Sequence, residues 1–406
     1  MFDILILNRI SERIFEELPP SGFTVTDNSK DPDGILVRSA TMLDRPFSAR
    51  LLAVARAGAG YNNIPVSRCS EAGIVVFNTP GANANAVSEL TLAGLLLSSR
   101  RIVEGVNWIR KLKAKGVSGL AVRVEKDKAD FAGPELAGKK LGVIGLGAVG
   151  VLVANACEAL GMAVAGYDPY LSVDAAWGLS RRVSRATSLS GLLAESDYIT
   201  LHVPLTDATR CWFGETMLNQ VKRGARLLNF SRGEIVDDPA ALASLRDGRL
   251  ARYVTDFPSD ELVGAEGVIV LPHLGASTPE AEDNCAVMAA RQLRNYLESG
   301  VVANSVNLPD CDIGPAWGAR LTVINRNVPN VVGPITTALA GLGMNIANML
   351  NKSKGDYAYN IIDLDDPGSA GVPASEALAS AVEKIAGING VIRVRVIDGK
   401  SDGRRA

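Results

Sequence analysis

Residues 141–150, LGVIGLGAVG, decide the fold of this chain. The apolar run Leu141–Ile144 predicts a buried strand, and three glycines follow it in the spacing G-x-G-x-x-G: Gly145, Gly147 and Gly150. The residues after Gly150 contain no helix breaker, so they predict a helix. A pyrophosphate site needs this order, because the turn lets the backbone approach the phosphates and the helix N-terminus presents free N–H groups.

The following strand supplies an acidic residue. The run Ala163–Tyr167 predicts a strand and ends in Asp168, where an acid would bind the ribose hydroxyls of an adenosine. This carboxylate would repel a 2′-phosphate and no arginine follows it directly, so we expect NAD rather than NADP. Arg181 and Arg182 lie further along the chain. The alternative is a tight turn in an ordinary α/β core, but the strand, helix and acid together favour a dinucleotide site.

Length and composition limit the number of domains and the kinds of partner that this chain can have. A chain of 406 residues predicts two or three domains, and its net charge of −2, without a dense Lys/Arg block, predicts no nucleic-acid partner. We expect no membrane partner, because no apolar segment has spanning length and the N-terminus lacks the basic start of a signal peptide. The five cysteines form no C-x-x-C pair, so we expect a reduced, cytoplasmic protein without a disulfide or a bound metal.

The first 76 residues alternate strand-like and helix-like runs and predict a small parallel α/β unit. Arg38 and Arg56 stand at the carboxyl ends of two of its strands, where open parallel sheets bind ligands. Each is either a solvated arginine or part of an anion site.

A second α/β unit follows. Its predicted strands lie near 141–144, 163–167, 182–183, 197–201, 225–229, 252–255 and 268–271. Helices between these strands imply right-handed crossovers and a doubly wound sheet. The basic stretch 105–130 is interpreted as a helical connection between domains. The next predicted helix is Thr278–Leu297, with Ser277 and Glu280 spaced as a capping box and Pro279 in the first turn.

The C-terminal pattern differs from the rest. Residues 307–320 contain two prolines and two glycines and predict a linker. The order that follows is strand 321–326, helix 329–342, strand 345–351, strand 357–364, helix 374–386 and strand 391–397. This is a split βαβ module of ferredoxin-like type, and residues 400–406 predict a frayed tail.

Only two histidines can act as a general acid or base. His273 lies in a loop between a predicted strand end and a helix, whereas a buried or backbone-contacting role suits His202 better. Arg232, in NFSRGE at 229–234, cannot lose its proton and can hold a carboxylate in bidentate fashion. The segment 255–261, TDFPSDE, supplies acids that could orient the His273 imidazole. Taken separately, each also fits a structural role.

Five segments together carry a family resemblance: GLGAVG at 145–150, LHVPLT at 201–206, NFSRGEIVD at 229–237, DFP at 256–258 and PHLGAST at 272–278. They resemble the D-2-hydroxyacid dehydrogenases, and residues 320–398 resemble an ACT regulatory domain. The resemblance implies an α/β fold with a Rossmann nucleotide domain at 98–275. It implies a split flavodoxin-like substrate domain at 1–97 and 276–307, and a linker at 308–319 before the ferredoxin-like ACT domain. The active site would lie in the cleft between the first two domains.

The resemblance also implies roles for matched positions. His273 would take the hydroxyl proton, and Arg232 would bind the substrate carboxylate and polarise the C2 oxygen. The substrate would be bound by Arg38, Ser39, Arg56 and Asn83. The predicted NAD-binding residues are Gly145, Gly147, Ala148, Val149, Gly150, Asp168, His202, Val203, Pro204 and Asp256. An L-serine effector would meet Asn325, Asn327 and Asn345.

Two departures from the family pattern affect these roles. The usual segment D-V-F-x-x-E-P is shortened here to Asp256-Phe257-Pro258. Glu261 keeps the spacing from Asp256 and Asp260 keeps the spacing from Phe257, so either acid, or neither, pairs with His273. In the glycine loop, Ala148 stands where many relatives have an arginine, which removes one phosphate contact.

Within the family, the chain is most similar to members that oxidise 3-phospho-D-glycerate at C2 with NAD, the first step of serine biosynthesis. The closest alternative is another 2-hydroxyacid dehydrogenase, such as a hydroxypyruvate or glyoxylate reductase. A more distant alternative is an NAD-sensing interaction protein similar to transcriptional corepressors. The resemblance further implies a homodimer or homotetramer, and the C-terminal module either binds serine or only builds the oligomer.

Overall fold

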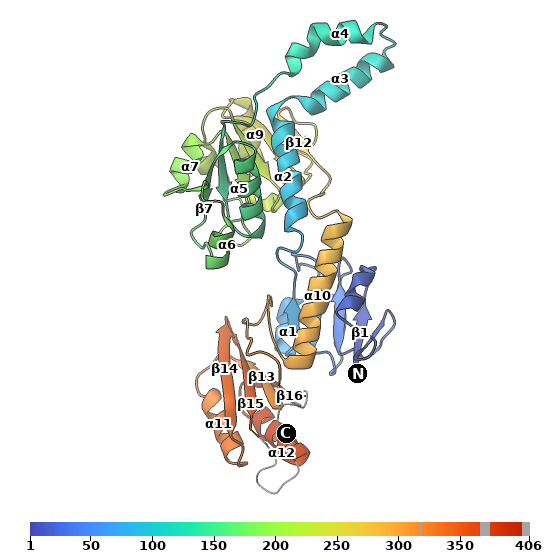
Figure 1. Ribbon diagram of the computed structural model, residues 1–406, viewed down its shortest axis with the longest axis vertical. Coiled ribbons are helices and arrows are strands. Elements are labelled where there is room, and N and C mark those ends of the chain that lie inside the picture. Colours follow the sequence, from blue (N-terminus) through green and yellow to red (C-terminus); the bar gives the residue numbers. More distant parts are fainter. Residues whose placement is uncertain (317, 366–373, 400–406) are drawn as a thin grey trace. The chain divides into compact units, whose positions relative to one another are not determined.

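The computed structural model describes residues 1–316, 318–365 and 374–399, and the predicted tail at 400–406 lies outside them (Figure 1). The chain forms two compact units, each described separately below. Unit 1 contains residues 1–82 and the described residues from 282 onward, and unit 2 contains residues 83–281. The chain therefore passes between the units twice, at 82/83 and at 281/282. Among the described residues, no helix combines the length and the apolar character of a membrane span.

Unit 2 is built on a seven-stranded, fully parallel sheet in the order β12-β11-β10-β9-β6-β7-β8. The strands are β6 Lys140–Ile144, β7 Ala163–Tyr167, β8 Ser184–Arg185, β9 Tyr198–Leu201, β10 Ala225–Asn229, β11 Leu250–Thr255 and β12 Val268–Val270. Counted from the glycine motif this is the order 3-2-1-4-5-6-7, so the predicted doubly wound Rossmann sheet is confirmed. The third strand lies at 184–185 rather than the predicted 182–183.

Helices follow the strands of this sheet as predicted. They are α5 Ala148–Ala159, α6 Val173–Gly178, α7 Leu189–Glu195, α8 Glu215–Leu218 and α9 Asp238–Arg246, with a 3-10 turn η3 at Gly233–Ile235. Helix α2, Ala84–Ser99, also belongs here because it packs against α5 and the sheet. The unit boundary therefore lies before α2, whereas the sequence placed the domain boundary after it, at 97/98.

Residues 102–131 form a helical arm on unit 2, made of α3 Ile102–Ala114, α4 Leu120–Asp127 and the 3-10 turn η2 Lys128–Phe131 (Figure 1). The prediction of helix is confirmed, but the interpretation as a connection between domains is wrong, because the arm lies wholly inside unit 2. None of the residues of α3, α4 or η2 is buried.

Unit 1 contains a five-stranded parallel sheet in the order β2-β1-β3-β4-β5, the flavodoxin-like order. The strands are β1 Phe2–Ile6, β2 Phe23–Thr26, β3 Gly34–Val37, β4 Ala53–Arg56 and β5 Val75–Phe77. A 3-10 turn η1, Glu12–Glu16, and helix α1, Val66–Glu71, connect them. The long helix α10, Pro279–Ser299, buries its apolar face in the same core as β1, β3, β4 and β5.

The N-terminus of α10 differs from the predicted capping box. Thr278 Oγ1 accepts a hydrogen bond from the Ala281 N–H at 3.1 Å, so Thr278 is the N-cap. Ser277 instead donates its hydroxyl to the His273 carbonyl at 3.4 Å. The prediction of Ser277 as the cap is therefore wrong by one residue, whereas Pro279 occupies the first helical position as expected.

The C-terminal part of unit 1 is a four-stranded antiparallel sheet in the order β14-β15-β13-β16, with two helices. Its elements are β13 Ala319–Arg326, α11 Val332–Ala340, β14 Ile346–Lys354, β15 Tyr357–Leu364, α12 Ala374–Ala386 and β16 Val391–Asp398. The predicted βαββαβ order of ferredoxin-like type is confirmed. The module has its own core, and three residues of its sheet, Ile324, Tyr359 and Ile361, also enter the core around α10.

Candidate functional site

The glycine loop lies between β6 and α5, and its three glycines are required for different reasons. Gly145 has φ +89°, and a Cβ there would lie 2.5 Å from the His202 carbonyl oxygen. A Cβ on Gly150 would lie 2.0 Å from the Gly145 carbonyl oxygen, whereas a Cβ on Gly147 would meet no atom within 4 Å. Gly145 and Gly150 therefore permit the turn itself, and Gly147 faces the open space in which a phosphate would lie.

Helix α5 begins at Ala148, directly after this loop, with Gly147 as its N-cap. No side chain caps the helix, so its first N–H groups are available to an anion. Ala148 and Val149 are the first helical residues and offer backbone N–H groups rather than side-chain donors.

Asp168 follows β7 and is tied to the glycine loop. Its Oδ2 accepts the Leu146 N–H at 2.8 Å and its Oδ1 accepts the Tyr170 N–H at 2.8 Å. These bonds hold the carboxylate next to the turn, and each oxygen keeps a further lone pair for a ribose hydroxyl. The contact of Asp168 with the adenosine ribose stays a prediction.

Three other predicted residues follow three adjacent strands. Arg232 lies after β10, Asp256 directly after β11 and His273 after β12. Because these strands are parallel neighbours, their carboxyl ends meet at one edge of the sheet, the same edge at which the glycine loop follows β6.

His273 is an exposed residue with φ +47°, a left-handed conformation that is uncommon for histidine. Its N–H donates to the carbonyl oxygens of Asp256, at 2.9 Å, and Leu271, at 3.1 Å. Its ring packs against the Phe257 ring with centroids 5.0 Å apart. Phe257 also lies against Gly233, where an added Cβ would come within 3.0 Å of the Phe257 Cβ. Phe257 therefore contacts the loops of both His273 and Arg232, a role that no sequence signal indicates.

The acid partner of His273 was left open between Glu261, Asp260 and no acid. In the described part of the chain, neither carboxylate forms an ion pair or hydrogen bond with the His273 ring. Both residues are exposed. Burial raises the pKa of the nearby Asp238 carboxyl, and the charge of Glu261 adds to this effect. The assignment of an acid partner stays a prediction.

Asp256 is 1% exposed and behaves differently from these two acids. Burial raises its pKa, while the Gly275 N–H, which donates to Oδ2 at 2.8 Å, and the nearby His273 lower it. Its other oxygen, Oδ1, is buried and has no hydrogen-bond partner among the described residues. A buried acceptor at this sheet edge without a partner fits a bound group that brings a donor, such as the amide of a nicotinamide.

Arg232 is held by the residues before it. Its carbonyl oxygen accepts the Asn229 side-chain amide at 2.8 Å, and its Nη1 donates to the Ser231 carbonyl at 2.6 Å. Asn229 is fully buried and its Oδ1 also accepts the Ser231 hydroxyl at 2.9 Å. Asn229 is therefore a positioning residue for this loop. It belongs to the NFSRGE motif, but the motif alone does not indicate this role.

His202 follows β9 and faces the glycine loop with its backbone. Its Nε2 lies 2.9 Å from Thr200 Oγ1, and burial lowers its pKa to about 4. The imidazole is therefore neutral at neutral pH. Val203 lies beside Gly145, and Pro204 is exposed.

In unit 1, Arg38 follows β3 and Arg56 ends its neighbour β4. Asn63 connects them: its Oδ1 accepts from Arg56 Nε at 3.1 Å, and its Nδ2 donates to the Arg38 carbonyl at 3.3 Å. Both arginines lower the pKa of the Cys285 thiol on α10, although burial of that thiol raises it overall. The two cations therefore lie near one point, and Asn63 is a further residue that the sequence reading missed.

These loops make further contacts within unit 1. Arg38 Nη2 pairs with Glu282 Oε1 at 2.6 Å, and Ser39 beside it is exposed. The Arg56 guanidinium covers Gly58, where a Cβ would lie 2.4 Å from Nη1. Asn83, the fourth predicted substrate residue, is the N-cap of α2 and the first residue of unit 2.

The three predicted effector asparagines do not meet within one chain. Asn325 is buried near the end of β13 and its amide is used by Asn360 and the Arg326 carbonyl, while Asn327 follows that strand. Asn345 donates to Asp365 at the opposite end of the sheet, past Arg320, which stands at the other end of β13 from Asn325. The five residue steps along β13 from Arg320 to Asn325 correspond to about 17 Å.

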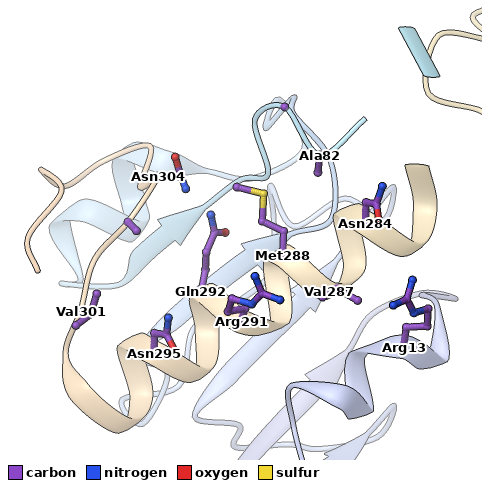
Figure 2. A pocket seen from close by; sticks show the side chains of 12 residues that line it. Arg13, Ala82, Asn284, Val287, Met288, Arg291, Gln292, Asn295, Val301 and Asn304 are labelled. Carbon is purple, nitrogen blue, oxygen red and sulfur yellow. The ribbon is translucent and has the colours of Figure 1, made fainter. Parts of the chain in front are cut away.

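A cavity lies in unit 1 beside α10, and none of the predicted site residues lines it (Figure 2). It is treated below as a separate feature. The predicted nucleotide site is instead defined by the loops at the carboxyl edge of the unit 2 sheet.

Comparison with known proteins places this edge in a family. Residues 92–275 match the family described as D-isomer specific 2-hydroxyacid dehydrogenase, NAD binding domain. The chain is 33% identical over 314 residues to D-3-phosphoglycerate dehydrogenase of Methanocaldococcus jannaschii, covering 74% of this chain and 57% of the relative. It is 29% identical over 421 residues to D-3-phosphoglycerate dehydrogenase of Escherichia coli K12, covering 97% of each chain.

The chain spans less than two thirds of the length of the archaeal relatives from Methanocaldococcus jannaschii and Archaeoglobus fulgidus. Among solved structures, the NAD⁺-bound 3-phosphoglycerate dehydrogenase of Entamoeba histolytica is similar, with a TM-score of 0.59 and 26% identity. The match covers 75% of this chain and 98% of that one.

These findings confirm the predicted resemblance and, at the level of the family, NAD as the cofactor. The glycine loop, Arg232, Asp256 and His273 all lie inside the matched region, on loops at the same edge of one parallel sheet. For this reason residues 92–275 belong to the NAD-binding domain of the D-isomer-specific 2-hydroxyacid dehydrogenase family.

Proposed function

We propose that this chain is an NAD-dependent dehydrogenase that oxidises 3-phospho-D-glycerate at C2 to 3-phosphohydroxypyruvate. The observation that carries the proposal is the placement of Arg232, Asp256 and His273 after three adjacent parallel strands, at the edge that also holds the glycine loop. The relatives described as D-3-phosphoglycerate dehydrogenases support this substrate over other 2-hydroxy acids.

The residues of unit 2 fit NAD. The N–H groups at the start of α5 and the open space beside Gly147 would receive the pyrophosphate, and Asp168 would accept the ribose hydroxyls. The buried Oδ1 of Asp256 would accept the nicotinamide amide. When bound, NAD supplies the hydride acceptor.

His273 and Arg232 would act on the substrate itself. The imidazole of His273 would take the proton of the C2 hydroxyl as the C2 hydride leaves. The Arg232 guanidinium would bind the substrate carboxylate and polarise the C2 oxygen, because its planar donors match carboxylate oxygens in charge-assisted hydrogen bonds. The contact of Phe257 with His273 and Gly233 would keep both loops in place.

Arg38, Ser39 and Arg56 of unit 1 would bind the phosphate. The proximity of both arginines to Cys285 and their connection through Asn63 support a shared anion site. We further propose residues 98–275 as the nucleotide domain, against which α2 packs, residues 1–97 with 276–307 as the substrate domain and 308–319 as the linker.

The experiment that tests this proposal compares two substrates in two variants. For 3-phospho-D-glycerate, Arg38→Ala should raise KM about tenfold or more, because a charge-assisted hydrogen bond to phosphate is lost. For unphosphorylated D-glycerate the KM should hardly change. Arg9→Ala, an exposed arginine after β1, is the matched control and should change neither value. Equal KM changes for both substrates would instead favour a reductase of unphosphorylated acids.

We also propose that the arm 102–131 associates with a second copy of the chain. Ile102, Val106 and Ile109 of α3 are 38–44% exposed at helical spacing, and Val122 of α4 is 78% exposed. An apolar face of this kind is typical of a subunit interface. Analytical ultracentrifugation of the wild type should show a dimer or tetramer. The double variant Val106→Lys/Ile109→Lys should sediment as a smaller species. A variant with the same mass as the wild type would contradict the arm as the interface.

For the C-terminal module we propose an ACT-type regulatory role with L-serine as effector. The ferredoxin-like strand order and the E. coli relative, which aligns over 97% of both chains, support it. Because Asn327 and Asn345 lie at opposite ends of the sheet, a site that uses both needs a second chain. L-serine should raise the thermal midpoint of the wild type and not of Asn327→Ala, with D-serine as control. No shift at millimolar L-serine would contradict this role.

A further inference from the structure

The cavity beside α10 has a volume of about 570 Å³ and a lining of both polar and apolar side chains. A row of side chains at helical spacing along α10 forms one side: Asn284, Met288, Gln292 and Asn295 (Figure 2). Asn304, on the segment after α10, lies across from this row. None of these residues belongs to the proposed NAD, substrate or serine sites.

Gln292 shows that this wall lacks a partner. The residue is 6% exposed, and neither its Nε2 nor its Oε1 has a hydrogen-bond partner among the described residues. Buried amides are almost always bonded to protein, water or ligand, because an unbonded one loses its hydration without compensation. The adjoining cavity, which this side chain lines, is the space from which a partner can come.

Two arginines of the cavity wall are oriented by acids outside it. Arg291 Nε donates to Glu17 Oε1 at 2.8 Å, and its Nη2 lies 2.8 Å from the same oxygen in an ion pair. Arg13, in η1, donates from Nε and Nη2 to Glu16, at 2.8 and 3.2 Å. Neither arginine donates a hydrogen bond from Nη1 to the described residues. The Nη1 of Arg13 lies 4.0 Å from Asp283 Oδ2, which is an ion-pair distance but too long for a hydrogen bond.

The lining residues contain these two cations and no carboxylate. Fixed guanidinium groups match carboxylate and phosphate oxygens, and the amide side chains offer both donors and acceptors, which suit hydroxyl groups. Val287 and Val301 add apolar contact for a carbon chain. The volume suits a small metabolite.

We propose that this cavity is a binding site for a small hydroxylated organic anion, held by Arg13 and Arg291 through its acidic group and by the α10 amides through its hydroxyls. The site is separate from the proposed catalytic residues, so it does not depend on the proposed function. A hydroxycarboxylate and a polyol phosphate share this chemistry, and the test below distinguishes them.

The test is isothermal titration calorimetry of the full chain with L-tartrate, with sn-glycerol 3-phosphate and with neutral glycerol. We expect heat from at least one anion and none from glycerol, and the anion that binds identifies the acidic group. Arg291→Gln should weaken binding about tenfold or more. The matched control is Arg294→Gln: Arg294 also pairs with Glu17 but does not line the cavity, so this variant should leave the affinity unchanged.

Two further variants separate a ligand site from a structural role and from the catalytic site. Gln292→Leu should weaken anion binding while keeping or raising the thermal midpoint, because it removes an unbonded buried amide. Arg232→Gln should bind the anion as the wild type does. Equal losses in Arg291→Gln and Arg294→Gln, loss of binding in Arg232→Gln, or no heat from either anion would overturn the proposal.

Discussion

His202 links the predicted nucleotide site to the pH dependence of stability. Burial lowers its pKa from 6.5 to about 4, so between these values the unfolded chain binds a proton that the native chain excludes. The free energy of unfolding should therefore fall as the pH drops through this window, by at most about 3 kcal/mol. Some surface of His202 remains accessible, which makes this figure an upper value.

Urea denaturation between pH 7 and pH 4 measures this contribution. His202→Asn should give a shallower loss of stability in the same window, since asparagine binds no proton. A profile identical to that of the wild type would show that other groups account for the whole pH dependence.

The cysteines differ in environment, and this predicts their reactivity. All five are free thiols, and burial raises the pKa to about 12 for Cys69 and Cys157 and to about 11 for Cys311. Cys211 is the exposed one. Because the thiolate is the reactive form, a disulfide reagent at pH 8 should modify one thiol rapidly in the native chain. Cys211→Ser should remove this fast phase, and rapid modification of several thiols would contradict the burial of the others.

The sequence identified most site residues singly but not their partners. The glycine spacing predicts its residues because a turn and a close approach require them whatever the surroundings. The environment of His273 depends on Phe257 and on the path of the segment 256–261, which residue spacing alone does not determine. Asn63 escaped notice for the same reason, since its role arises from contacts between two loops.

At the scale of single elements, the glycine loop makes a matched pair of predictions. Gly150→Ala places a Cβ 2.0 Å from the Gly145 carbonyl and should lower the thermal midpoint of the protein without cofactor. The Cβ added by Gly147→Ala would meet no atom within 4 Å, so this variant should keep the thermal midpoint. It should weaken NAD binding, which titration with NAD measures. Equal effects of both changes on stability would contradict the assigned geometry.

Helix α10 tests the corrected cap. Thr278→Ala should lower the free energy of unfolding by about 1 kcal/mol, because the N–H of Ala281 loses its acceptor. Ser277→Ala is the matched control and should cost less than about 0.5 kcal/mol. Thermal or urea denaturation measures both, and a larger effect for Ser277 would restore the cap that the sequence predicted.

Elements with strong local signals were predicted closely, and those that depend on packing were not. Strand β15 and helix α12 have the predicted limits, because alternation or helical periodicity marks them throughout. The start of α2 was placed too late, since its first residues are polar and favour a loop, yet its packing on α5 extends the helix. The role of the arm 102–131 lacked any such signal.

At the scale of the whole molecule, Arg320 fixes the C-terminal module to the rest of unit 1. It is 0% exposed, and it donates to Asp363 Oδ1 at 2.6 Å and to the carbonyls of Ser299 and Gly314 at 2.7 and 2.8 Å. Tyr359 donates its hydroxyl to the Gly300 carbonyl at 2.7 Å. The module is thus joined to the end of α10 by buried polar contacts, which the linker-like composition of 307–320 did not predict.

Removing this arginine should therefore be costly. Arg320→Met leaves Asp363 and several carbonyls without their donor and should lower the free energy of unfolding of unit 1 by about 3–5 kcal/mol. Arg326→Met, on the same strand but exposed, should cost about 1 kcal/mol or less. Similar costs in urea denaturation would contradict the bridging role of Arg320.

The central claim is that the carboxyl edge of the unit 2 sheet carries out hydride transfer with His273 as the base. The most direct measurement is NADH formation at 340 nm from NAD and 3-phospho-D-glycerate at alkaline pH, by the wild type and by His273→Asn. Asparagine tolerates the left-handed backbone at this position, so the fold should persist. We expect activity in the wild type and a fall of about 100-fold or more in kcat for the variant. A silent wild type, or a variant with full activity, would contradict the claim.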